Sequence, residues 1–116
     1  MKHDWRLLTM AVAGLLLVAA MAAWSDDCAT TYTNFGQAFL TKYCNTCHST
    51  PLVGAARRGA PSNVNFDQPE LAAKFAARIL HRTTVKANMP PAASTPQPTA
   101  EERAKVQAWI GCEFPR

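Results

Sequence analysis

Apolar side chains recur at helical spacing in three stretches of this chain. The positions that define these stretches are Tyr32, Phe35, Phe39 and Tyr43, then Leu71, Phe75 and Ile79, and finally Val106, Trp109 and Ile110. Steps of three and four place such residues on one face of a helix. We therefore predict helices over 32–44 and 69–82 and a third from Thr99 to near Gly111. The sequence shows no alternating strand-like runs and no repeats, so the predicted fold class is all-α.

Local signals support these boundaries. Pro69 suits the first position of a helix, and the Thr99-x-x-Glu102 sequence is a capping box. The segment 45–68 contains glycines and prolines without a sustained period, and the four prolines in 83–98 forbid a continuous helix. Both segments are predicted loops. A loop as long as 45–68 is unusual in a compact domain unless something orders it, and a buried cofactor would do so.

The start of the chain has a different pattern. Lys2 and Arg6 precede an uncharged, apolar run over 7–23 that ends in small residues. Such a sequence is typical of a secretory signal peptide, which we assign to 1–22. The alternative is an uncleaved membrane anchor, for which a run of 17 residues is at the short end of the roughly 17–25 that a span needs. In either case the domain over 23–116 would face an oxidising, non-cytoplasmic space.

Composition narrows the classes of function. The 12 Lys and Arg and 8 Asp and Glu give a net charge of +4, without the dense basic stripe of nucleic-acid-binding proteins. We therefore predict no nucleic-acid partner. Without residues 1–22, the only methionine is Met89 and the only histidines are His48 and His81. The 94 residues that remain (116 − 22) form a small core, which often needs a covalent staple or a bound cofactor.

The most informative motif is Cys44-Asn45-Thr46-Cys47-His48. A C-x-x-C-H sequence is typical of c-type haem attachment. Two thiols three positions apart can form thioethers with the two vinyl groups of one haem, and the next residue then lies beneath the iron. The sequence therefore predicts one covalent haem c on Cys44 and Cys47, with His48 as an axial ligand of the iron.

Two other kinds of site also use closely spaced cysteines. A zinc site needs four ligands, or three and a water, and would have to recruit Cys28, Cys112 and His81, because the sequence has no second close pair of cysteines. A thioredoxin-like dithiol expects a βαβ pattern, which is missing. Haem attachment is the interpretation that needs no further residues.

The second axial ligand is predicted to be Met89. It lies in the sequence Asn88-Met89-Pro90-Pro91, where the prolines fix the backbone. A Met/His pair is typical of the electron-transfer cytochromes c and raises their potential. The alternatives are His81, near the end of the second predicted helix, and an open sixth position.

The chain resembles the class I cytochromes c over roughly 32–114. Gly36-x-x-x-Leu40-x-x-x-Cys44 is similar to the first helix of that family, in which the glycine lets the last helix cross closely, and the stretch with Trp109 is similar to that last helix. Val64-Asn65-Phe66-Asp67, Met89-Pro90-Pro91 and the C-terminal Trp-Ile-x-Cys resemble a bacterial periplasmic branch. The resemblance implies a cytochrome c-like fold, with three main helices around one haem, and a periplasmic location.

The resemblance also implies further contacts. One loop carbonyl would accept the Nδ1–H of the proximal histidine, and Pro61 is our candidate. Arg57 and Arg58 are candidates for the haem propionates. Cys28 and Cys112 flank the first and last helices, which pack together in this fold, so we expect a disulfide between them. The alternatives are two free thiols or intermolecular pairing.

The function predicted from these features is one-electron transfer by a non-enzymatic carrier that docks transiently with redox protein partners. We expect a monomer, associated with a membrane only if residues 7–23 are retained. If Met89 were not bound to the iron, a haem peroxidase or gas-binding protein with an open or His-ligated sixth position would be the alternative. A third possibility is an anchored module of a larger respiratory complex.

Overall fold

The computed structural model describes residues 27–115. The predicted signal peptide over 1–22 lies outside these residues. The described part of the chain consists of helices and loops and contains no strand, which confirms the all-α prediction. Within 27–115, none of the helices is both long and apolar enough to cross a membrane.

The first helical segment begins with a π-helical turn, η1 (Tyr32–Gly36), and continues as α1 (Gln37–Tyr43). This confirms the helix predicted over 32–44 to within one residue. Its start is fixed by a reciprocal cap that the sequence analysis did not identify. Thr31 Oγ1 accepts from the Asn34 N–H at 3.1 Å, and Asn34 Oδ1 accepts from the Thr31 N–H at 2.7 Å.

The second predicted helix is present but broken. It consists of α2 (Pro69–Lys74), α3 (Ala76–Leu80) and a π-helical turn, η3 (His81–Val85). Phe75 separates α2 from α3, with φ −102° and ψ 9°. The prediction that a loop begins at residue 83 was wrong, because the helical segment continues to Val85. The buried Thr83 hydroxyl donates to the Ile79 carbonyl one turn back, and the first proline comes only at position 90.

The last helix, α4 (Ala100–Glu113), ends two residues later than expected. The predicted capping box is confirmed: Thr99 Oγ1 accepts from the Glu102 N–H at 3.1 Å, and Glu102 Oε2 accepts from the Thr99 N–H at 2.8 Å. The same carboxylate oxygen accepts from the Tyr43 hydroxyl at 2.7 Å. The Glu102 side chain therefore caps the N-terminus of α4 and links α4 to the end of α1 by a hydrogen bond.

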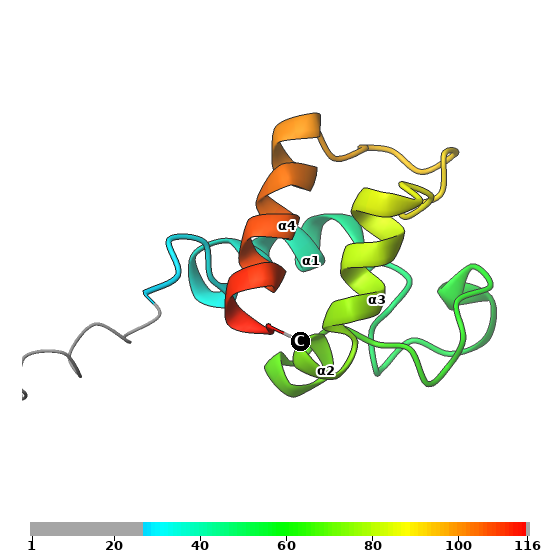
Figure 1. Ribbon diagram of the computed structural model, residues 1–116. Coiled ribbons are helices and arrows are strands. Elements are labelled where there is room, and N and C mark those ends of the chain that lie inside the picture. The colour runs from blue at the N-terminus through cyan, green and yellow to red at the C-terminus, as the bar shows by residue number, and fades with distance from the viewer. Residues whose placement is uncertain (1–26, 116) are drawn as a thin grey trace, which may run out of the picture.

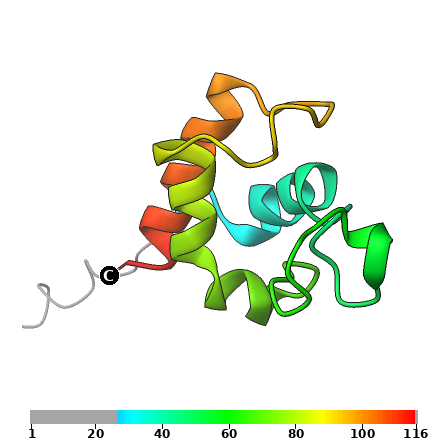
Figure 2. The same cartoon turned by 90° about the vertical axis from the view of Figure 1, so that its right-hand side faces the viewer.

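Two long loops leave the helical framework on the same side. Figure 1 shows α4 beside α3 and across the segment that contains α1. In both views the 45–68 loop, which includes a single 3₁₀ turn η2 (Gly54–Arg57), and the 86–99 loop project from one side of α3 and α4 (Figures 1 and 2). The predicted ligands His48 and Met89 belong to these two loops.

The core lies where the first and last helical segments cross. Trp109 of α4 is fully buried, and a Cβ built on Gly36 would lie 2.5–2.8 Å from three atoms of its indole ring. The other buried apolar residues are Phe39, Leu40, Tyr43, Cys44, Val64, Phe66, Ala72, Ala76, Ile79, Val106 and Ile110. Only glycine fits at position 36, which confirms the predicted close crossing.

Replacing Gly36 with alanine is expected to destabilise the fold by about 1 kcal/mol, or more if the helix gains little from alanine, because the indole ring cannot move away without disturbing the core. Overpacking costs about 1–3 kcal/mol, which exceeds the gain of up to about 1 kcal/mol for Gly→Ala in a helix. Urea unfolding measures the change. Gly111→Ala in α4 is the matched control: its Cβ would meet no atom within 4 Å, and we expect it to stabilise. Equal effects of the two variants would contradict the crossing.

Candidate functional site

The C-x-x-C-H sequence forms a tight turn directly after α1. The Cys44 N–H still donates to the Leu40 carbonyl at 2.9 Å, and the Cys44 carbonyl then accepts from the N–H groups of Cys47 at 3.1 Å and His48 at 2.9 Å. Cys44 is buried and Cys47 half-buried, and neither is in a disulfide. One turn therefore carries two reduced thiols and an imidazole.

The imidazole of His48 is fixed by the far end of the 45–68 loop. Its Nδ1 lies 2.9 Å from the Val64 carbonyl oxygen, and its ring packs on Phe66 with centroids 4.8 Å apart. The His48 carbonyl also accepts from the Phe66 N–H at 2.9 Å. The acceptor is thus Val64 and not the predicted Pro61, whose carbonyl lies 2.6 Å from Arg57 Nη2.

Burial lowers the pKa of His48, and the charge of Arg57 lowers it further, although the hydrogen bond to Val64 opposes both. The imidazole is therefore neutral at pH 7. Because a carbonyl can only accept, Nδ1 carries the proton and Nε2 carries the lone pair. This is the form in which histidine binds a metal, with its other nitrogen held by an outer hydrogen bond.

Arg57 is buried, with 4% of its surface exposed. Its five N–H groups are used within the loop by six acceptors, which are the carbonyls of Ser49, Leu52, Ala60, Pro61 and Val64 and the side-chain oxygen of Asn65. The propionate contact predicted for Arg57 is therefore replaced by a role inside the loop. Arg58 is exposed, at a positive φ of 49°, and its propionate contact stays a prediction.

Met89 is half-buried in the 86–99 loop. Its N–H donates to the Arg82 carbonyl at 3.2 Å, and its own carbonyl accepts from Arg103 Nη1 of α4 at 3.2 Å. The backbone at Met89 is thus held from two helical segments, as a ligand loop requires. Iron ligation by Met89 stays a prediction. His81, the alternative ligand, is exposed at the start of η3.

The second pair of cysteines is bridged. Cys28 and Cys112, 84 positions apart in the sequence, form a disulfide with Cα atoms 5.7 Å apart. This confirms the predicted bridge and removes both cysteines from a zinc site. Among residues 27–115, no group of three or more His, Cys, Asp and Glu side chains gathers around a common point.

Comparison with other proteins gives no match. No known protein family, no curated protein and no solved structure is significantly similar to the chain.

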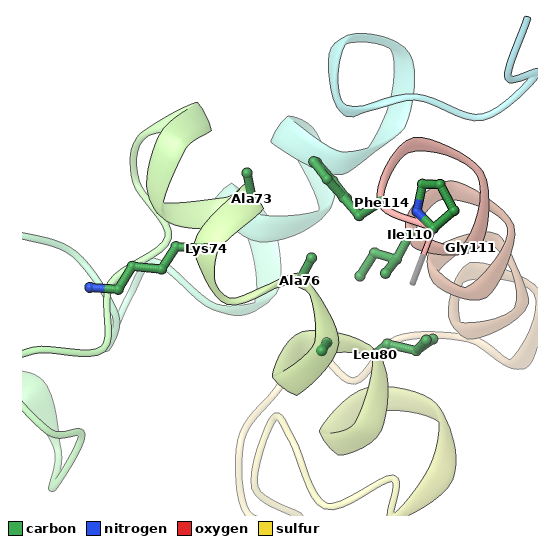
Figure 3. Close-up of a pocket in the computed structure, with 9 residues that line it drawn as sticks. Ala73, Lys74, Ala76, Leu80, Ile110, Gly111 and Phe114 are labelled. Atoms are coloured by element: carbon green, nitrogen blue, oxygen red, sulfur yellow. The ribbon is translucent and has the colours of Figure 1, made fainter. Parts of the chain in front are cut away.

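A separate hollow of about 360 Å³ lies between α2–α3 and the end of α4. Figure 3 shows Ala76, Leu80, Ile110 and Phe114 around it, with the Lys74 side chain extending away. None of Cys44, Cys47, His48 and Met89 lines this hollow. It is therefore distinct from the candidate site.

Val64 and Asn65 are the site residues that sequence reasoning missed. Val64 acts through its backbone, so its side chain gives no signal. Asn65 gives a weak one, because it is a polar residue between the apolar Val64 and Phe66. All three are buried, and a buried amide needs partners. It finds them in Arg57 and in the Ser62 carbonyl.

Proposed function

We propose that this protein is a one-electron carrier with a haem c joined to Cys44 and Cys47 and with His48 and Met89 as its axial ligands. The observation that carries this proposal is the geometry of His48. Its Nδ1 is bound to the Val64 carbonyl at 2.9 Å, next to two reduced thiols in the same turn. This combination places a neutral metal ligand and two thiols outside any disulfide in one turn.

The state of the cysteines supports haem attachment. In each linkage a thiol adds across a vinyl group: a carbon–sulfur bond forms, and the other vinyl carbon gains a proton. Only reduced thiols can react in this way. Cys44 and Cys47 lie outside any disulfide, while Cys28 and Cys112 of the same chain form one, so the two thiols of the turn are available for this bond.

The fold proposed is cytochrome c-like. The close crossing of the first and last helical segments at Gly36 and Trp109 supports it. So does the projection of the loops with His48 and Met89 from one side of the framework (Figures 1 and 2). The bridge between Cys28 and Cys112 supports a periplasmic location, because disulfides persist in oxidising compartments.

Bound haem supplies an iron that alternates between the ferric and ferrous states. His48 would hold one axial position in a fixed ring orientation, and the 86–99 loop would present Met89 at the other. With both positions filled by the chain, no place is left for a substrate, and gain of an electron needs little rearrangement. The protein would then exchange electrons only by transient contact with redox partners.

The decisive experiment is expression in a periplasm with c-type haem attachment machinery. We expect haem staining on a denaturing gel, a mature mass increased by one haem, and a far-red band of methionine–iron ligation in the ferric spectrum. Cys44→Ser/Cys47→Ser should lose the covalent haem, whereas Cys28→Ser/Cys112→Ser, with the same number of thiols removed, should keep it. A wild-type chain without covalent haem would refute the proposal.

A further inference from the structure

Arg57 brings a positive charge into the interior of the 45–68 loop without a carboxylate as hydrogen-bond partner. Its six acceptors are five backbone carbonyls and the amide oxygen of Asn65, all of them neutral. Only 4% of its surface is exposed. Neutral acceptors stabilise the guanidinium but do not cancel its charge, which solvent screens less at this depth than at the surface. The same charge helps to lower the pKa of the nearby Asp67 carboxyl, which Thr50 holds by hydrogen bonds.

One of these acceptors is shared with the proximal histidine. The Val64 carbonyl oxygen lies 2.9 Å from His48 Nδ1 and 3.2 Å from Arg57 Nη2. A carbonyl oxygen has two lone pairs and can accept both donors. Donation from a cation is stronger than donation from a neutral group. Arg57 therefore draws electron density from this oxygen and weakens its pull on the Nδ1 proton of His48.

We propose that Arg57 is a positioning residue that acts on His48 through the shared Val64 carbonyl and thereby raises the affinity of the iron site for an electron. This inference rests on the proposed function, since it requires haem bound at His48. Arg57 also holds the two ends of the 45–68 loop together beside His48, because it donates hydrogen bonds both to the Ser49 carbonyl and to the Asn65 side chain.

The direction of the effect follows from charge. A ferric iron carries one more positive charge than a ferrous iron, so a nearby buried cation disfavours it. A weaker hydrogen bond at Nδ1 leaves the imidazole less anionic, which also disfavours the ferric state. Both effects raise the reduction potential, and loss of Arg57 must therefore lower it.

The test compares haem-loaded Arg57→Gln, Arg57→Lys and Arg78→Gln with the wild-type protein. Arg78 lies exposed on α3, so its replacement removes the same charge where solvent screens it. Two quantities are measured: the midpoint potential, and the proton chemical shift of His48 Nδ1–H in the ferrous protein. Arg57→Gln should lower the potential by about 59 mV, a tenfold change in the one-electron equilibrium, and move the His48 proton to lower field. Arg57→Lys, which keeps the charge, should change the potential less.

The outcomes separate this inference from the proposed function. A wild-type protein without covalent haem overturns both. If haem is bound but Arg57→Gln behaves as Arg78→Gln does, only the role of Arg57 is refuted. If Arg57→Gln lowers the potential but leaves the chemical shift of the His48 Nδ1–H proton unchanged, the proposed role of Arg57 is also refuted. Arg57 would then act on the iron without the Val64 carbonyl.

A second variant covers the case in which Arg57→Gln does not fold. Asn65→Asp keeps the acceptor of Arg57 Nη2 and adds a carboxylate that cancels the charge and draws the guanidinium from Val64. It should lower the potential and move the His48 proton to lower field, as Arg57→Gln does. A His48 proton at its wild-type position in Asn65→Asp would overturn the inference.

Discussion

Replacing Met89 with alanine should lower the reduction potential of the haem-loaded protein by more than about 120 mV, a hundredfold change in the one-electron equilibrium constant. A thioether ligand stabilises ferrous iron, and Met/His ligation raises the potential of cytochromes c. The shortened side chain would also open the sixth position. We therefore expect the ferrous variant to bind carbon monoxide and the ferric variant to lose the far-red band, as redox titration and visible spectra would show.

Met89→His is the matched control for this prediction, because it replaces the ligand without opening the site. It should also lower the potential, but its ferrous form should not bind carbon monoxide. If Met89→Ala keeps the wild-type potential and spectrum, Met89 is not a ligand. His81→Ala would then show whether His81 is the ligand, and carbon monoxide binding by the wild-type protein would indicate the peroxidase or gas-binding alternative.

Removing the disulfide with Cys28→Ser/Cys112→Ser is expected to lower the free energy of unfolding of the haem-loaded protein by up to about 4.5 kcal/mol. The bridge closes a loop of 84 positions, and a crosslink of that span strongly restricts the unfolded chain. It also ties the segment before η1 to the end of α4, where the crossing at Trp109 needs both ends in place. Urea unfolding with linear extrapolation gives the change.

Chemical reduction provides an independent control for the disulfide. A thiol reductant opens the disulfide but leaves thioether bonds intact, so reduced wild-type protein should unfold at the urea concentration found for Cys28→Ser/Cys112→Ser. The serine variant itself should not respond to the reductant. Equal midpoints for reduced and oxidised wild-type protein would show that the bridge does not stabilise the fold.

The helices could be predicted largely because their signals are local. The Thr99–Glu102 capping box and the proline at position 69 mark helix starts by their own chemistry, and both are where they were expected. The break at Phe75 could not be predicted, because the apolar period continues through it. The cap at Thr31 was missed because Asn34 takes the place that Glu or Gln usually holds.

The site was predictable only as far as side chains identify it. The spacing of Cys44, Cys47 and His48 indicates the turn that the structure shows. The acceptor for His48 was assigned to Pro61 instead of Val64, since any residue has a carbonyl and only the folded loop decides which one is aligned. Two adjacent arginines look alike in a sequence, yet Arg57 is buried and Arg58 exposed.

The burial of Cys44 has a consequence for the order of events in biosynthesis. Burial raises the pKa of its thiol to about 12, whereas thiols react as thiolates. In the finished fold this thiol is shielded and protonated, so a haem on Cys44 would have to be added while the chain is still open. The packing of Trp109 against Gly36 requires α4, the last helix within residues 27–115. Cys44 belongs to the same buried core as Trp109, so completion of that core by α4 would end the period in which the cofactor can be attached.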